Sequence, residues 1–251
     1  KTNLDYGIFS ALQKAAETAL QLPDQYLEAV QTRYRKLVSK AFSLKRVMGM
    51  GDYVAETTNK IIDQFINEGA CEFKTAFANE LPMRVIADQL GVPQSDMDKF
   101  RVWSDAFVDQ LGGVAGREAQ LEAARNIVEY QKYFAGKIEE KRANPTDDVI
   151  SDLVHVTLEE EGDPRSMEVP EILSIMQQLL VAGNETTAHT LTAGIYYLLQ
   201  NPDQMQALLN DFDLVENFVE EVLRYLSPTN NMWRVVKQDT KLNGVDIPAG
   251  S

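Results

Sequence analysis

The stretch from Val169 to Gln200 constrains the fold more than any other part of this chain, because it has the pattern of one long helix. Pro170 stands near its start, where a helix tolerates proline. Midway, six polar residues gather around a glycine, in the run Gly183-Asn184-Glu185-Thr186-Thr187-Ala188-His189-Thr190. A glycine costs a helix interior about 1 kcal/mol relative to alanine, and an unpaired buried carboxylate costs far more. Residues that are unfavourable for the helix that contains them often mark a functional site.

The rest of the chain predicts helix after helix, so we expect a mainly α fold. The expected helices cover 32–42, 53–66, 81–90, 95–112, 116–142, 149–158, 169–200, 202–209 and 214–226. Only the tail changes character, because 233–236 and 241–247 predict short β strands with a turn at Asn243-Gly244. No repeat and no domain boundary is visible. We therefore expect a single domain over 1–251 with a small β appendage near its C-terminus.

Composition excludes several classes of protein. The 251 residues include 24 basic and 38 acidic side chains, a net charge of −14, which argues against binding to nucleic acid or to an anionic membrane surface. One cysteine and two histidines exclude an intrachain disulfide framework and a cysteine-rich zinc cluster. No apolar run is long enough to span a membrane, so we expect a cytoplasmic protein.

A second motif, Glu221-Val222-Leu223-Arg224, places a carboxylate and a guanidinium three residues apart on one helix face among apolar neighbours. Such a pair tolerates burial only when it is hydrogen-bonded, and we expect it to be a buried structural pair. A plain surface ion pair fits the same spacing. The central polar segment likewise also fits a helix–helix packing notch with a Glu185–His189 pair.

In their order and spacing these motifs resemble the cytochrome P450 family of haem-thiolate monooxygenases, above all its soluble bacterial members. Residues 182–187 are similar to the oxygen-activation motif of the family's long central helix. Glu221 to Arg224 resembles its Glu-x-x-Arg helix, and 234–250 resembles the β segment that follows. Upstream, 31–42 is similar to the helix that binds the haem propionates. The resemblance covers the chain from about Gln31 onward and implies a partial P450-like helical fold.

The resemblance also implies roles for individual residues. Glu185 and Thr186 match the acid–alcohol pair that relays protons to bound dioxygen, as a catalytic pair. Ala182 and Gly183 match the positions where the helix opens over the haem, and a glycine there lets a flat ligand lie against the backbone.

The resemblance also implies which residues bind the haem propionates and which line the substrate pocket. Arg35 and Arg234 match arginines that pair with haem propionates, and Gln31 stands where the family commonly has a histidine. The expected substrate-pocket residues are Val181, Asn230 and Met232. A plain core role fits these pocket residues equally well.

The chain departs from the family at the iron ligand. The family's ligand is a cysteine in a Phe-Gly-rich loop well downstream of Glu-x-x-Arg, and this chain stops at Ser251 before such a loop. Cys71 lacks that glycine context, so we interpret it as a buried small apolar residue. The family's N-terminal β-rich region is also missing. We therefore expect a portion of a longer protein, inactive alone, with the axial cysteine beyond Ser251.

For the parent protein the resemblance implies a haem b monooxygenase that hydroxylates an apolar or amphipathic small molecule. It would use O2 and electrons from a separate ferredoxin and ferredoxin reductase, since no flavin or iron–sulfur segment is visible. One alternative is peroxide-driven haem oxygenation or a haem-dependent rearrangement. Another alternative, for the chain as it stands, is a helical binding module without catalysis.

Overall fold

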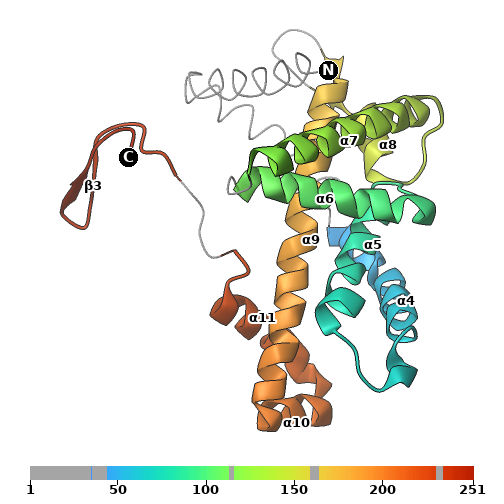
Figure 1. Ribbon diagram of the computed structural model, residues 1–251, viewed down its shortest axis with the longest axis vertical. Helices are drawn as coiled ribbons and strands as arrows, with labels where there is room; N and C mark the ends of the chain where they lie inside the picture. The colour runs from blue at the N-terminus through green and yellow to red at the C-terminus, as the bar shows by residue number, and fades with distance from the viewer. Residues whose placement is uncertain (1–34, 36–43, 113–115, 159–163, 230–233) are drawn as a thin grey trace. The chain divides into compact units, whose positions relative to one another are not determined.

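The chain is described here from a computed structural model, which covers residues 35, 44–112, 116–158, 164–229 and 234–251 (Figure 1). Within these residues the fold is mainly α, as the sequence predicts. The helices are α3 (Leu44–Gly49), α4 (Gly51–Ile62), α5 (Glu80–Gln89), α6 (Met97–Gly112), α7 (Arg117–Ala143), α8 (Val149–His155), α9 (Val169–Gln200), α10 (Pro202–Asn210) and α11 (Val215–Leu226). Single turns of other helix types are η1 (Ile66–Glu68), η2 (Lys74–Ala78), η3 (Gln94–Asp96) and η4 (Phe212–Leu214).

Four short strands form two antiparallel pairs within the described residues. The strand β1 (Thr157–Leu158) pairs with β2 (Arg165–Ser166), and β3 (Thr240–Leu242) pairs with β4 (Val245–Ile247). Asn243 and Gly244, which connect β3 and β4, have φ angles of 49° and 83°. Asparagine and glycine tolerate this left-handed backbone, so the predicted hairpin turn is confirmed.

Three sequence-predicted elements differ from the structure by more than two residues. The helix expected over 149–158 ends at His155, because the β-branched run Val156-Thr157 is extended and opens β1. The helix expected over 53–66 ends at Ile62. Residues 234–236 do not form the expected strand, although the Val236 N–H donates to the Ser251 carbonyl at 3.0 Å.

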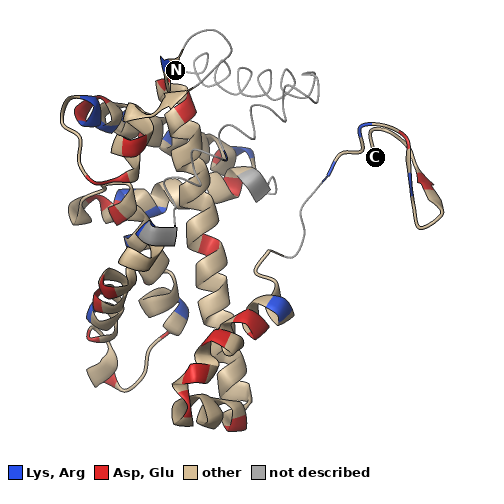
Figure 2. Ribbon diagram, turned by 180° about the vertical axis from the view of Figure 1, so that it is seen from behind, with Lys and Arg blue, Asp and Glu red and all other residues tan. Residues whose placement is uncertain are grey.

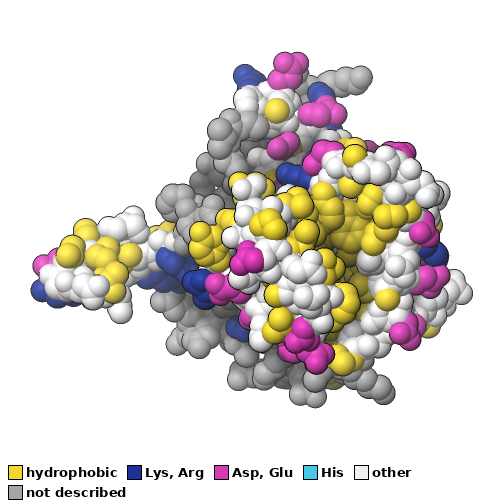
Figure 3. Space-filling view, turned by 90° about the horizontal axis from the view of Figure 1, so that it is seen from below, with side chains coloured by type: hydrophobic (Ala, Val, Ile, Leu, Met, Phe, Trp, Pro, Cys, Tyr) yellow, Lys and Arg dark blue, Asp and Glu magenta, His cyan; other side chains and the backbone are white. Residues whose placement is uncertain are grey.

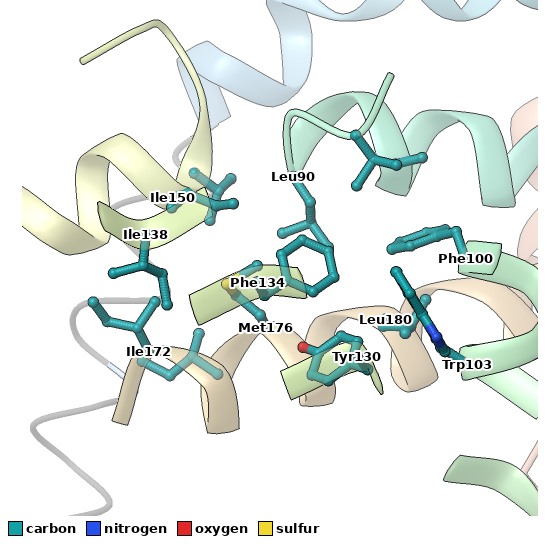
Figure 4. Close-up of a cluster of buried hydrophobic side chains, with 14 of the residues drawn as sticks. Leu90, Phe100, Trp103, Tyr130, Phe134, Ile138, Ile150, Ile172, Met176 and Leu180 are labelled. Carbon is teal, nitrogen blue, oxygen red and sulfur yellow. The ribbon is translucent and has the colours of Figure 1, made fainter. Parts of the chain in front are cut away.

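The core of the first part of the chain is built on aromatic side chains of α6 and α7 (Figure 4). Phe100, Trp103 and Phe107 recur at helical spacing along α6, and Tyr130 and Phe134 do so along α7. The rings of Tyr130 and Phe134 lie 4.8 Å apart, and those of Phe107 and Tyr130 lie 4.9 Å apart, edge to face. Aromatic contacts of this geometry add to the burial of apolar area.

The long helix α9 contributes one buried stripe. Ile172, Met176 and Leu180 follow each other at four-residue spacing, and all three are fully buried in the same core. The helix stays α-helical without a break from Val169 to Gln200, including 181–187. The local opening expected at Ala182 and Gly183 is therefore not seen in this structure.

The contacts of the chain cluster into two compact units, 1–185 and 186–251, which divide within α9. The single domain expected over 1–251 stays a prediction. In the second unit, α11 packs on the end of α9. A Cβ added at Gly194 would lie 3.3 Å from Phe218 Cζ, and the rings of Tyr197 and Tyr225 lie 5.2 Å apart.

The surface of this second unit is acidic and partly apolar. Carboxylates outnumber basic side chains on α10, η4 and α11 (Figure 2). Large apolar side chains are also exposed there. Apolar side chains at the surface are seen in the space-filling view (Figure 3). The exposed apolar residues of these elements include Leu209, Phe212, Val215, Val219 and Leu223. None of the described helices is both long enough and apolar enough to cross a bilayer.

A buried ion pair joins α7 to the start of α8. Lys141 Nζ lies 2.6 Å from Asp148 Oδ2, and both residues are buried. Asp148 also accepts hydrogen bonds from Thr146 Oγ1 at 2.6 Å and from the Ser151 N–H at 2.8 Å, the second as the N-cap of α8. Burial raises the pKa of the Asp148 carboxyl, but these bonds lower it more, so the pKa lies below its ordinary value.

We predict that replacing Phe134 by alanine lowers the free energy of unfolding by about 3–5 kcal/mol, because the ring is fully buried and leaves a cavity. Denaturant unfolding of the full-length protein measures the loss. The control Lys132→Ala alters an exposed position of the same helix and should change stability by less than about 0.5 kcal/mol. Equal effects of the two substitutions would contradict the core described here.

The Asp148 pair predicts a specific pH dependence of stability. The pKa of the Asp148 carboxyl is lower in the folded state than in the unfolded chain, where it is about 3.9. The contribution of Asp148 to the free energy of unfolding is therefore present above that pH and is lost as the pH falls through the folded pKa. Asp148→Asn should flatten the fall of the unfolding free energy in acid. Asp147→Asn, which changes a fully exposed neighbour, should leave that slope unchanged. The same slope in Asp148→Asn and wild type would refute the prediction.

Candidate functional site

The turn of α9 that carries the polar motif presents its side chains in different directions. Ala182 and Glu185 are exposed, and Thr186 is half-exposed. Asn184 is 7% exposed and continues the buried stripe that begins at Ile172. The motif is therefore divided, with a carboxylate and a hydroxyl toward the outside and an amide toward the core.

Helix α5 accounts for the glycine of the motif. A Cβ added at Gly183 would lie 2.7 Å from Ile86 Cδ1, which is closer than real Cβ contacts, and 3.1 Å from Ile86 Cγ1, which is tight. The sequence predicts that a flat ligand makes this close approach. In the structure the approach is made by an aliphatic side chain of the chain itself, so packing of α5 on α9 explains the glycine. A cofactor contact at Gly183 stays a prediction.

Helix α6 meets α9 at the next residue. Asn184 Nδ2 donates to Ser104 Oγ at 3.3 Å, and both residues are buried. Asn184 Oδ1 is buried and has no hydrogen-bond partner among the described residues. Sequence reasoning missed this contact, although the four-residue spacing of Leu180 and Asn184 could have indicated it.

Two acidic residues stand next to the residues of this contact. Asp105 comes directly after Ser104, and Glu185 comes directly after Asn184. Burial raises the pKa of the Asp105 carboxyl, Arg101 lowers it, and the negative charges of Asp109 and Glu185 raise it further. The resulting pKa is above its ordinary value although the residue as a whole reaches solvent. Sequence reasoning did not single out Asp105.

Arginines connect this group to α5. An Arg101 guanidinium N–H donates to Glu80 Oε1, and Arg84 Nη2 lies 3.3 Å from Glu80 Oε2. Asp98 lies 4.0 Å from the same Arg101 guanidinium. The positive charge of Arg101 is thus shared among several carboxylates and does not belong to Asp105 alone.

The threonines of α9 form hydrogen bonds back along the helix. Thr190 Oγ1 donates to the Thr186 carbonyl and Thr192 Oγ1 donates to the Ala188 carbonyl, each at 2.8 Å. This bonding satisfies a hydroxyl inside a helix without an outside partner.

The other predicted binding residues are scattered along the chain. Arg35 and Arg234 are each exposed. Val181 is half-buried and packs against the core, which is the alternative that the sequence left open. Gln31, Asn230 and Met232 lie outside the described residues. The predicted roles of these six residues in binding haem or substrate stay predictions.

The Glu221–Arg224 pair forms with the predicted spacing but not with the predicted burial. Arg224 Nε and Nη2 donate to the two carboxylate oxygens of Glu221, each at 2.6 Å. This hydrogen bonding lowers the pKa of Glu221. The side chains are 66% exposed for Arg224 and 62% for Glu221, so the expectation of a buried pair is wrong for this structure. An exposed pair contributes little to stability.

Cys71 also differs from its interpretation, because it is exposed and not buried. It lies in the irregular segment between η1 and η2. No group of three or more His, Cys, Asp or Glu side chains within the described parts of the chain could hold a metal ion.

Comparison with known proteins gives one consistent family. The sequence profile of the family Cytochrome P450 matches residues 117–216 and 204–251. The steroid C26-monooxygenase of Mycolicibacterium smegmatis is 37% identical over 216 residues, which are 86% of this chain and 53% of that protein.

Solved structures of cytochrome P450 proteins are also similar to this chain. The structure of P450BioI in complex with hexadec-9Z-enoic acid ligated acyl carrier protein has a TM-score of 0.80 and 31% identity, over 87% of this chain and 55% of that one. CYP109E1 from Bacillus megaterium in complex with testosterone has a TM-score of 0.78 and 34% identity, over 91% of this chain and 59% of that one. The chain thus spans about half the length of the relatives that it matches.

The packing of Ile86 on Gly183 predicts how alanine is tolerated there. Gly136→Ala on α7, where an added Cβ meets nothing within 4 Å, should stabilise the protein by up to about 1 kcal/mol through helix propensity. Gly183→Ala should gain less, because Ile86 must move, and Ile86→Val should restore the gain by removing the nearer atom. Thermal or denaturant unfolding measures all four proteins. Equal gains at 183 and 136 would show that Ile86 does not restrict this position.

Proposed function

Because this chain belongs to the cytochrome P450 family, we propose that the protein of which it forms part is a haem-dependent monooxygenase. The proposed reaction inserts one oxygen atom of O2 into an apolar or amphipathic small molecule and reduces the other to water, with two electrons and two protons. The relatives are named monooxygenases or P450 proteins, and the chain spans about half their length. The function proposed is accordingly that of the whole protein.

The observation that carries this proposal is the orientation of α9. Its core stripe buries one face, which leaves Ala182, Glu185 and Thr186 on the sides that reach the surface of the described chain. A carboxylate followed by a hydroxyl on such a face can move protons from solvent toward a ligand. Peroxide-driven oxygenation needs no such pair, because peroxide brings its own protons and electrons.

The residues present fit part of a haem site. The exposed guanidinium groups of Arg35 and Arg234 have the chemistry that propionates require, and the side chain of Ala182 is small and exposed. Ile86 packs on Gly183, and a cofactor contact at this glycine stays a prediction. A bound haem would also take a ligand to its iron from the protein. We assign that ligand to a cysteine in the part of the relatives' length that this chain does not span.

When bound, haem supplies the activation of O2. The protein groups then have two tasks. The Glu185 carboxylate takes up a proton from solvent at its Oε atoms, and Thr186 Oγ1 passes a proton onward to the oxygen that leaves as water. The aliphatic contact of Ile86 and the amide contact of Asn184 hold this turn of α9 in place while the protons move.

The proposed substrate is apolar or amphipathic. The relatives support this, since one is named for action on a steroid, one is solved with testosterone and one with a hexadecenoic acyl group on a carrier protein. These molecules share a large apolar body with a polar end. We place the source of electrons in a separate ferredoxin-type protein with its reductase.

A paired substitution on α9 tests the proposal. In the full-length protein, a haem titration should be saturable, and Thr186→Val should lower O2-driven product formation about 100-fold, the scale of general acid catalysis. Turnover supported by added peroxide should be retained. The control Thr192→Val removes a hydroxyl that only bonds the Ala188 carbonyl and should leave both activities near wild type. Absence of saturable haem binding, or equal losses in the two variants, would overturn the proposed function.

A further inference from the structure

We propose that Glu80 of α5 is a positioning residue for the motif turn of α9, residues 182–185, because it links the two helices that hold this turn. The inference rests on the proposed function, in which Glu185 of the turn moves protons. Glu80 bonds arginines of α5 and α6, so it acts on α9 through these two helices. It adds a position outside every sequence motif to the residues on which the reaction depends.

Two contacts on successive residues of α9 come from different helices. Ile86 of α5 lies against Gly183, where an added Cβ would be 2.7 Å from Ile86 Cδ1. Asn184 Nδ2 donates to Ser104 Oγ of α6 at 3.3 Å. Because successive helical residues point about 100° apart, these contacts hold the turn from two sides. Glu185, the next residue, is exposed.

Glu80 links the two helices from which these contacts come. An Arg101 guanidinium N–H of α6 donates to Glu80 Oε1, and Arg84 Nη2 of α5 lies 3.3 Å from Glu80 Oε2. The side chains of Glu80 and Arg84 are each 20% exposed, so solvent screens their charges less than those of a surface pair. Helices α5, α6 and the middle of α9 thus each contact the other two (Figure 1).

The charges around this link make Glu80 the residue on which it depends. Two guanidinium groups share its carboxylate, and without that negative charge Arg84 and Arg101 would repel each other across the α5–α6 contact. Asp98 and Asp105 also act on Arg101, but both belong to α6, as Arg101 does, so neither links it to α5. Loss of the Glu80 charge therefore loosens the placement of the two side chains that hold the motif turn.

The motif turn needs this support because its own sequence favours a helix only weakly. Glycine and threonine are poor helix formers, and 183–187 contains one glycine and two threonines. A turn that opens more often places the Glu185 carboxylate less precisely, and proton transfer requires a hydrogen-bond distance of about 2.6–3.2 Å. The expected consequence is impaired proton delivery with unchanged binding of substrate.

The first experiment measures the turn without any need for haem. Hydrogen–deuterium exchange is followed in the full-length protein, in peptides that cover 181–187 and 169–176. Glu80→Gln keeps the size of the side chain but removes its charge, and should speed exchange over 181–187 about fivefold. Exchange over 169–176 should not change, because Ile172 and Met176 are fully buried in the core.

Matched variants show whether the link itself is responsible. The control Asp98→Asn removes another negative charge beside Arg101, at 4.0 Å, from a fully exposed side chain of α6, and should exchange as wild type does. Arg101→Gln should also speed exchange over 181–187, and the double variant should exchange no faster than Glu80→Gln, because both substitutions remove the same bond. Unchanged exchange over 181–187 in Glu80→Gln, an equal rise over 169–176, or additive rises in the double variant would overturn the inference.

The second experiment measures the reaction in the haem-loaded protein. Testosterone and hexadec-9Z-enoic acid, which are bound in the similar solved structures, serve as probes. When proton delivery to the leaving oxygen fails, O2 takes up two electrons and two protons and leaves as hydrogen peroxide. Glu80→Gln should therefore lower the share of consumed O2 that appears as product about threefold, the scale of a small misplacement. The KM for the probe and the peroxide-supported turnover should stay at wild-type values.

The outcomes separate this inference from the proposed function. A wild-type share of product in Glu80→Gln would overturn the role of Glu80 while the monooxygenase function stands. A raised KM or a parallel loss of peroxide-supported turnover would show a general loosening of the fold and overturn that role as well. A wild-type protein that binds no haem or converts neither probe would count against the proposed function, and exchange over 181–187 would then still decide whether Glu80 holds the turn.

Discussion

The burial of one face of α9 against the aromatic core of α6 and α7 is the interaction on which the rest of this structure depends. Ile172, Met176 and Leu180 fix the rotation of the helix about its axis, because these side chains are fully buried. Because helical residues turn by a fixed angle of about 100°, this rotation also sets the direction of the next turn, up to Glu185. Asn184 continues the buried stripe, and Glu185 is consequently turned outward.

Two contacts then hold the motif turn at its sides. Ile86 packs against the bare backbone of Gly183, and Ser104 accepts a hydrogen bond from Asn184. One contact is aliphatic and comes from α5, whereas the other is polar and comes from α6. Together they explain why α9 stays α-helical through a segment rich in glycine and threonine. The residues that disagree with local helix propensity are stabilised by neighbours that are distant in sequence.

The Glu221–Arg224 pair and Cys71 show why burial was the weakest part of the sequence-based interpretation. A spacing of three residues places the carboxylate and the guanidinium side by side whether or not anything covers them. The two hydrogen bonds at 2.6 Å are thus predictable, while the exposure of both side chains is not. A cysteine with apolar and charged neighbours is equally ambiguous, and the structure places Cys71 at the surface.

The sequence by itself determined the features that depend on interactions within about four residues. These features are the mainly helical class, the hairpin at Asn243-Gly244, the long helix 169–200, the ion pair of α11 and the order of motifs that indicates the family. Only the tertiary structure decided what lies against each motif residue. Ile86 at Gly183, Ser104 at Asn184 and the charge of Glu185 acting on Asp105 all join residues about 80 or more positions apart. No local pattern encodes such contacts, because they exist only after the helices have packed.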